Sequence, residues 1–426
     1  FSFLLLNALF LRNPWLIESI SGGILSIITL LILLSLLSIY LVSKKTPKPS
    51  KTLKVALVFI LIASISPLIS ALINEESPSQ ALRYSIEMAL MGGFIYTAYY
   101  MIVMNIIKQN VIIIIITLLG SSVALDNLLN VQELVSVRRY AGLASVNYQG
   151  NTIGVSSVLS LFVLLNNRLY KYNKNYYKLL QLLFLFCMLI CGLAAFLSGS
   201  RQAILSLILG YFLVLLNYFN FNQNKYKIKN RINLSILIIS FSTLSLAVFP
   251  IQIPFIGHLD ITSLLNRFKL SNLQTVFNQR IKLTFGDSLV EIKSGIDLIF
   301  GQFQLYPELN TTNSAIFPHN IFISILLFSG AIAFIIVLIG IYLTVSDFFL
   351  IKKQLKQIKM YSGYNKFIYK NVQLLYILGV ALLCSLIYAL FSGRLTRTFN
   401  VFIYWGLFMG ATQQLLIKIR QFKLLH

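Results

Sequence analysis

Long apolar runs separated by short polar stretches dominate the chain. Runs such as "GGILSIITLLILLSLLSIYLV" and "GAIAFIIVLIGIYLTV" reach or approach the ~20 residues that cross a bilayer core as a helix. Strand-like alternation of apolar and polar positions is absent, so closed helices rather than a barrel must satisfy the backbone hydrogen bonds. The pattern predicts an all-α integral membrane protein with about twelve transmembrane spans, at residues 1–11, 24–43, 55–73, 84–107, 111–124, 152–166, 179–199, 202–218, 233–251, 319–345, 372–392 and 398–417.

The composition agrees with this class. Hydrophobic residues make up 57% of the chain and charged residues 11%, with a mean hydropathy of +0.80, whereas soluble domains carry about 25% charged residues. The net charge of +23 does not indicate a nucleic-acid partner, because most of the positive charge lies in loops beside apolar spans, where it sets topology. The three cysteines lie inside apolar spans, so no disulfide framework and no metal site is expected.

Lysine-rich segments punctuate every second junction between the predicted spans. Because cytoplasmic loops carry the excess of Lys and Arg, these segments and both termini are predicted to face the cytoplasm. The segments are "KKTPKPSKTLK", Lys108, "RLYKYNKNYYK", "KYKIKNR", the stretch from "KKQLKQIK" to "KFIYK", and "KIRQFK".

This topology leaves one long outer segment, residues 252–318. Loops of this length are uncommon without a function. Its middle, "FGDSLVEIKSGIDLIFG", mixes apolar and charged positions as a helix does, so a partly helical lid is expected. The expected organisation is nine spans within 1–251, the long loop at 252–318, and three spans within 319–426.

Arginine and lysine divide between the two predicted faces. Nine of the 12 arginines fall on the outer side, whereas 20 of the 23 lysines fall on the inner side. Topology does not require this split, but the planar guanidinium suits bidentate binding of phosphate or carboxylate. The outer face is therefore predicted to bind an anion. The alternatives are interfacial anchoring and ion pairing within the loops. The candidates are Arg138, Arg139, Arg201, Arg267, Arg280, Arg394 and Arg397.

Two of the outer residues stand out by position. Arg201 lies in "FLSGSRQAILSL", between two apolar spans, where it either snorkels as an anchor or binds a lipid-linked phosphate at the start of the next helix. His319 follows Pro318 where the long outer segment enters a span. It is either a structural residue at a helix start or a group that takes a proton at neutral pH.

Other chemistries lack their motifs. The chain has no GxxxxGK[ST], no HExxH and no DxD pair. A transporter would be expected to carry ionisable groups near the membrane midplane. The charges of this chain crowd the rims of the spans instead.

Three segments carry a resemblance to a known family. "FLSGSRQAILSL" resembles the Ser-Arg signature of the O-antigen polymerase and O-antigen ligase superfamily of bacterial membrane glycosyltransferases. "HNIFISILLFSG" resembles its His-Asn, nine residues, Gly pattern, which here joins His319 and Asn320 to Gly330. "SLVEIKSGIDLIFG" resembles the part of its long outer loop that ends in glycine, here Gly301. The order of these segments is also similar, so the resemblance covers most of the chain.

The resemblance implies a GT-C type fold and transfer of an undecaprenyl-diphosphate-linked glycan on the outer face of the bacterial cytoplasmic membrane, without a cofactor or an essential metal. It implies that Arg201 and further outer arginines bind the diphosphate. Arg267 or Arg280 would supply the long-loop arginine, and His319, followed by Asn320, would assist the acceptor hydroxyl. The expected partners are the lipid-linked oligosaccharide, membrane lipids, a flippase and a chain-length regulator, with no nucleic acid.

The resemblance leaves polymerase and ligase in competition. Arg139 and Gly150 fit the Arg, ten residues, Gly spacing of the polymerases, but Arg267 and Arg280 do not start such a motif. Ala333 departs from the ligase pattern, where Gly, Thr or Tyr is usual. We favour a polymerase, because that group is the more varied in sequence. The ligase is the alternative, and a lipid-linked glycan flippase or a non-catalytic scaffold would be a rival from another class.

Overall fold

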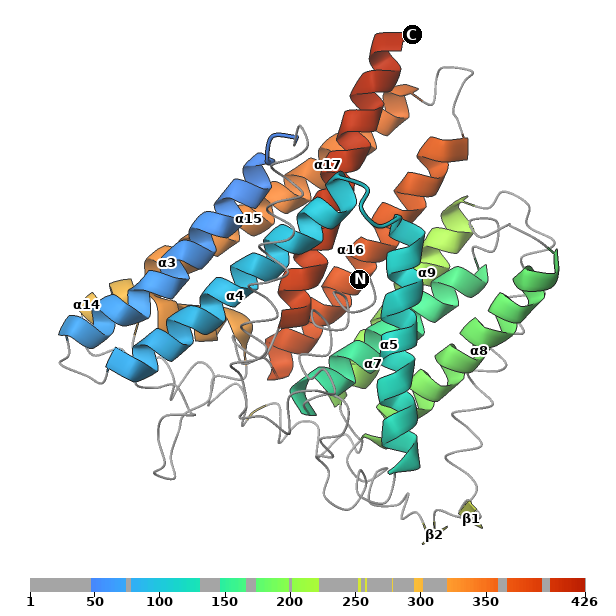
Figure 1. Ribbon diagram of the computed structural model, residues 1–426, viewed down its shortest axis with the longest axis horizontal. Helices are drawn as coiled ribbons and strands as arrows, with labels where there is room; N and C mark the ends of the chain where they lie inside the picture. The colour runs from blue at the N-terminus through green and yellow to red at the C-terminus, as the bar shows by residue number, and fades with distance from the viewer. Residues whose placement is uncertain are drawn as a thin grey trace. The chain divides into compact units, whose positions relative to one another are not determined.

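The structure is a computed structural model of the 426-residue chain (Figure 1). It describes residues 47–73, 78–130, 146–165, 174–198, 201–221, 252–253, 257–258, 278, 295–301, 320–358, 366–392 and 399–425. The expected spans at 1–11, 24–43 and 233–251 lie outside these residues.

The described residues are almost entirely helical. The long helices are α3 (Lys51–Ile73), α4 (Pro78–Val103), α5 (Gln109–Leu129), α7 (Val146–Leu165), α8 (Lys174–Leu197), α9 (Arg201–Phe221), α15 (Ile321–Ile358), α16 (Lys366–Ser392) and α17 (Phe399–Leu425). The long outer segment contains a short helix, α14 (Gly295–Phe300), and the antiparallel pair β1 (Gln252–Ile253) and β2 (Gly257–His258). Each long helix coincides with one predicted span, and α14 is a short helix within residues 252–318.

Six of the described helices are long and apolar enough to cross a membrane. These stretches are Lys51–Ile73, Tyr84–Val103, Asn110–Leu129, Leu179–Leu197, Ile321–Leu355 and Asn371–Leu390. Many large apolar side chains on them are exposed, such as Leu61, Phe186 and Ile335. A lipid environment removes the cost of exposing such side chains, so these helices confirm the membrane class.

Helix α15 is longer than the sequence suggested. The predicted span ended at residue 345, and "KKQLKQIK" was expected to lie in a loop, but the helix continues to Ile358. Lys, Gln and Leu are strong helix formers, so the polar stretch extends the helix beyond the membrane. With 38 residues and a rise of about 1.5 Å per residue, α15 is longer than a bilayer core of about 30 Å.

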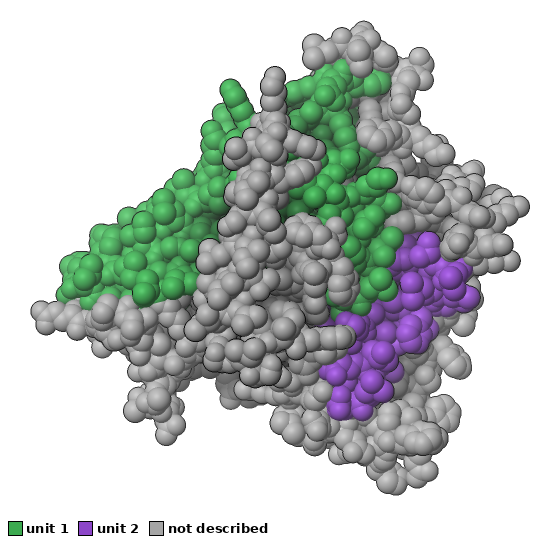
Figure 2. Space-filling model, in the orientation of Figure 1, with its two compact units in different colours: residues 1–119, 280–426 green, residues 120–279 purple. Residues whose placement is uncertain are grey.

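The chain divides into two compact units, which we describe separately. Unit 1 comprises residues 1–119 and 280–426, and unit 2 comprises residues 120–279 (Figure 2). Among the described elements, α3, α4, α14, α15, α16 and α17 belong to unit 1, whereas α7, α8 and α9 belong to unit 2. The sequence-based division into 1–251, 252–318 and 319–426 was drawn from the order of spans and the long loop. The two compact units are defined by packing, so they do not test that division.

In unit 1, α3 packs between α4 and α15, and α17 packs against both α4 and α16. The approach of α17 to α4 depends on glycine. A Cβ at Gly406 would lie 2.5 Å from the carbonyl oxygen of Ile95, and one at Gly410 would lie 2.6 Å from that of Tyr99. Two small residues four positions apart let the backbones of two helices come into contact. The stretch "GLFMG" in α17 therefore determines this helix pair.

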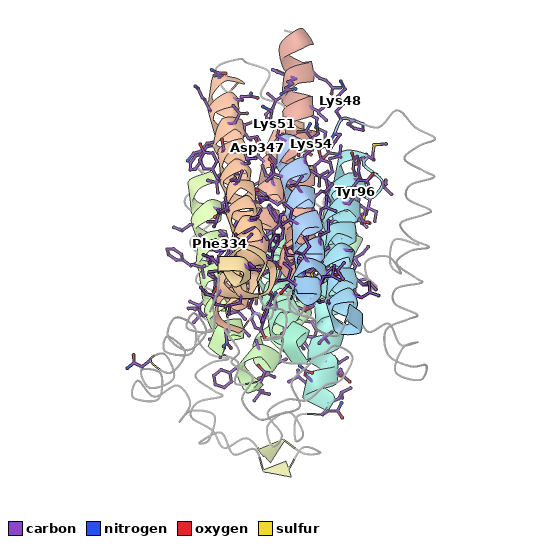
Figure 3. All side chains as sticks on the ribbon, turned by 90° about the vertical axis from the view of Figure 1, so that its left-hand side faces the viewer. Lys48, Lys51, Lys54, Tyr96, Phe334 and Asp347 are labelled. Atoms are coloured by element: carbon purple, nitrogen blue, oxygen red, sulfur yellow. The ribbon has the colours of Figure 1, made fainter. Side chains whose placement is uncertain are left out.

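Polar side chains tie the helices of unit 1 together at one end. Figure 3 shows Lys48, Lys51 and Lys54 at the same end as Asp347, and Thr52 Oγ1 donates a hydrogen bond of 2.5 Å to Asp347 Oδ2. Further bonds link neighbouring helices near this end: Ser50 N to Tyr99 Oη (3.1 Å), Trp405 Nε1 to Thr344 Oγ1 (2.8 Å), Gln414 Nε2 to the Ile102 carbonyl (3.0 Å) and Lys418 Nζ to Asn371 Oδ1 (3.1 Å). Burial lowers the pKa of the Lys418 ammonium below its usual value.

In unit 2, α7 packs against both α8 and α9 and is buried along nearly its whole described length. It is unusually polar for such a position, and its hydroxyls bond across the helix interfaces. Ser157 Oγ donates to the Met188 carbonyl of α8 (3.1 Å) and lies 2.6 Å from Tyr211 Oη of α9. Gly154 faces Ala203 and Ser206, so α9 begins directly against α7.

Candidate functional site

Helix α15 begins at the point that the sequence analysis singled out. Asn320 precedes its first residue, and Asn320 Oδ1 accepts hydrogen bonds from the backbone N–H groups of Phe322 (2.9 Å) and Ile323 (3.2 Å). This is the N-cap arrangement that Asn favours, because the first N–H groups of a helix lack partners within it. His319 lies outside the described residues but precedes this cap directly in sequence.

The cap changes the interpretation of Asn320, which was predicted to contact the glycan. Its side-chain oxygen is already used by its own helix, so a glycan contact would have to use Nδ2. Asn320→Ala is expected to lower the free energy of unfolding by about 1 kcal/mol, whereas Asn320→Asp, which keeps the capping oxygen, should change it little. Denaturant or thermal unfolding of the purified variants checks this. Equal losses in both variants would contradict a capping role.

Helix α15 is interrupted at Gly330. This residue has φ 80° and ψ 173°, a backbone conformation outside the helical range. It separates the N-terminal part of α15, residues 321–329, from the rest of the helix. Such backbone angles are essentially restricted to glycine. The N-terminal part of α15 therefore ends at Gly330, the glycine of the His-Asn, nine residues, Gly pattern.

The end of α14 packs directly into this interruption. A Cβ at Gly330 would meet the Ile299 carbonyl oxygen and lie 2.8 Å from the carbonyl carbon of Phe300. Gly301, with φ 79°, lies equally close from the other side, and its Cβ would be 2.7 Å from the Leu327 carbonyl oxygen. The two glycines come from separate segments of the sequence, and each lies against backbone atoms of the residues that precede the other. We call this contact the glycine junction.

Two other helices brace the glycine junction through buried hydroxyls. Ser70 Oγ of α3 donates a hydrogen bond of 2.9 Å to the Gly301 carbonyl. Tyr84 Oη of α4 lies 3.2 Å from Ser329 Oγ, and its ring packs edge-on against Phe328 with 6.4 Å between ring centroids. Tyr84 and Ser70 are each 1% exposed. Neither residue could be identified from the sequence, because a serine or tyrosine within an apolar run carries no signal of its partner.

The Ser-Arg segment lies in unit 2. Helix α8 ends at Leu197 and α9 begins at Arg201, so the short connection expected between these two spans agrees with the helix bounds. Ser198 Oγ donates a hydrogen bond to the Ala195 carbonyl of α8 (2.8 Å). The backbone of Arg201 forms the first residue of α9, and its side chain is not among the described ones.

The other predicted anion-binding residues lie outside the described ranges, so their roles stay predictions. They are Arg138, Arg139, Arg267, Arg280, Arg394 and Arg397. Within the described ranges, no group of three or more His, Cys, Asp or Glu side chains comes together as a metal site would require.

No family model matches this chain, and no curated protein sequence matches it significantly. The long apolar helices define the class as a membrane protein built from α-helices. In the described part, the glycine junction brings together the end of α14, the break in α15 and side chains of α3 and α4.

Proposed function

We propose that this protein is a glycosyltransferase that polymerises lipid-linked glycan repeat units. In this proposal it has the GT-C type fold, lies in the bacterial cytoplasmic membrane and works on its outer face. The donor is an undecaprenyl-diphosphate-linked oligosaccharide, and the acceptor is a hydroxyl of another lipid-linked unit. No metal and no nucleotide sugar takes part.

The glycine junction carries this proposal. Gly301 and Gly330 belong to two of the three segments that resemble the O-antigen polymerase and ligase superfamily, and 29 positions separate them in the sequence (330 − 301). In the structure each glycine packs against the backbone of the residues that precede the other, and α15 is interrupted at this place. If the two segments resembled the superfamily by chance, their glycines would have no reason to lie next to each other. A fold shared with the superfamily would explain why they do.

The reaction uses the charges of the outer face. The acceptor oxygen forms a bond to C1 of the donor sugar, the bond from C1 to the diphosphate oxygen breaks, and undecaprenyl diphosphate leaves with the electron pair. His319 takes the proton of the acceptor hydroxyl. Arg201, Arg139 and one of Arg267 or Arg280 neutralise the negative charge that develops on the diphosphate, which is commonly a large contribution to catalysis.

The placement of lysines supports the proposed orientation. Lys48, Lys51 and Lys54 lie at the end of unit 1 where α3 starts, whereas Ser70 and the glycine junction lie at the end where α3 finishes. Cytoplasmic ends of helices are rich in lysine. This arrangement supports an outer position for the start of α15, where the proposed lipid-linked glycan arrives after export.

Release of undecaprenyl diphosphate tests the function without knowledge of the sugars. The purified protein in nanodiscs is incubated with the lipid-linked oligosaccharide fraction of its host, and the released lipid is measured by mass spectrometry. We expect multiple turnovers and glycans that grow by whole repeat units. Transfer of the glycan to lipid A-core would indicate the ligase. Movement of the lipid across the bilayer without bond cleavage would indicate the flippase.

Arg201 is expected to require its guanidinium. Because a planar fork binds phosphate at two oxygens and an ammonium does not, Arg201→Lys should lower kcat/KM about 10-fold or more, and Arg201→Ala should lower it further. Initial rates of undecaprenyl diphosphate release measure this effect. Arg420→Lys, at an exposed arginine of α17, is the matched control and should behave as the unchanged protein. Full activity of Arg201→Lys would identify Arg201 as a membrane anchor.

A further inference from the structure

We propose that Ser70 and Tyr84 are positioning residues. They hold residues 321–329 of α15, and with them His319, in the orientation that the transfer reaction needs. This inference rests on the proposed function for its catalytic consequence. Its structural basis lies wholly within unit 1 and is independent of the sugars involved.

Residues 321–329 of α15 are connected to the rest of the helix through Gly330, which is not in a helical conformation. Between Phe328 and Ile332, Gly330 interrupts the helical conformation. Glycine permits backbone rotation that other residues resist. The direction of residues 321–329 is therefore not set by continuity with the helix and must be set by contacts at the interruption.

The geometry turns a small rotation at Gly330 into a large displacement at the catalytic end. Gly330 lies ten positions after Asn320 (330 − 320), which corresponds to about 15 Å of helix. A tilt of about 4° at Gly330 therefore moves the N-cap, and the residue before it, by about 1 Å. A misplacement of about 1 Å can cost about 10²-fold in rate.

The contacts that prevent this tilt come from two sides. Ser70 of α3 holds the Gly301 carbonyl, so that the end of α14 stays against Gly330. Tyr84 of α4 holds Ser329, the last residue before the interruption, through its hydroxyl, and holds Phe328 through its ring. Since α3 and α4 also pack against each other, both braces are attached to the same rigid helix pair.

Variants that lack one of the two hydroxyls test whether these residues position α15 or only stabilise the fold. Ser70→Ala and Tyr84→Phe each remove the hydroxyl that bonds to the glycine junction and keep the size of the buried side chain nearly unchanged. We expect kcat for undecaprenyl diphosphate release to fall about 10-fold in each variant, with KM for the lipid-linked donor changed less than about twofold. The matched control is Ser85→Ala, which deletes a buried hydroxyl of α4 that bonds only within its own helix, to the Ala81 carbonyl. It should keep the kcat of the unchanged protein.

A distance measurement tests the positioning without any activity. Spin labels are placed at Phe322→Cys on α15 and Leu61→Cys on α3, while the three native cysteines are buried and stay in place. The distance distribution should be narrow in this parent protein and in its Ser85→Ala form. It should broaden or shift in the combined Ser70→Ala, Tyr84→Phe form, and each single variant decides the question if the combined one does not fold.

The outcomes distinguish the two proposals. An unchanged distance distribution overturns the positioning role, and so does a loss of kcat in Ser85→Ala as large as in the two variants. A protein that releases no undecaprenyl diphosphate at all overturns the proposed function. In that case the distance distribution still decides whether Ser70 and Tyr84 orient α15.

Discussion

Replacing Gly330 with alanine is expected to separate α14 from α15 and to destabilise the protein. The new Cβ would meet the Ile299 carbonyl oxygen and lie 2.5 Å from the carbon of that carbonyl. These are backbone atoms, so no side-chain rotation relieves the overlap. Either α14 or residues 321–329 of α15 must move, and the packing of Gly301 against residues 327–329 is lost with it.

The backbone conformation adds to this effect. At φ 80° and ψ 173°, a residue other than glycine costs about 1–3 kcal/mol even where space is available. A loss of this size lowers the midpoint of thermal unfolding by about 2–12 °C, at about 2–4 °C per kcal/mol for a unit of roughly this length. The intrinsic fluorescence of the purified protein, recorded during heating, measures the midpoint for the unchanged and the substituted protein.

Gly295→Ala is the matched control for this substitution. Gly295 is the first residue of the same short helix, α14, and a Cβ placed on it meets no atom within 4 Å. Alanine is the better helix former, so this variant should unfold at the same temperature or slightly higher. If Gly330→Ala and Gly295→Ala unfold together, the glycine junction does not hold α14 against α15.

Replacing His319 with alanine is expected to lower kcat by about 10²- to 10⁴-fold, the usual contribution of a general base. The donor is held mainly by arginines in the proposed mechanism, so its KM should change little. In the sequence His319 directly precedes Asn320, whose side chain caps the first turn of α15. The residual rate of His319→Ala should also lose the fall at acid pH that a protonated imidazole causes in the unchanged protein.

Single-turnover release of undecaprenyl diphosphate, measured across a pH series, checks this expectation. His426→Ala, which changes the last residue of the chain, is the control and should keep the full rate and pH profile. Near-normal chain growth by a folded His319→Ala protein would remove this residue from the mechanism. The remaining interpretation would then be a structural histidine at a helix start.

The helices of this protein could be predicted well from sequence. An apolar run of the length of "ALVFILIASISPLISALI" has one stable form in a membrane, because only a helix satisfies its own backbone hydrogen bonds. The turn between α8 and α9 was equally clear, since Ser198 to Ser200 interrupt two such runs. The close approach of the two glycines of "GLFMG" in α17 to α4 was not predicted and comes from the structure alone.

What lies beside each helix could not be predicted in the same way. Ser70 and Tyr84 stand in apolar runs, and nothing local indicates that one meets the Gly301 carbonyl and the other Ser329. These pairs are 231 and 245 positions apart in the sequence. Asn320 was assigned to the glycan from its place in a motif, whereas its oxygen caps α15.

The sequence by itself determined that the chain forms membrane helices and which of their ends carry lysine, because both follow from local composition. The tertiary structure alone decided that α15 breaks at Gly330, since "LLFSGAIAF" is compatible with a continuous helix. The physical reason is steric. The backbone of α14 occupies the place of a Cβ at Gly330, and only glycine leaves room for the contact and adopts the conformation that it imposes.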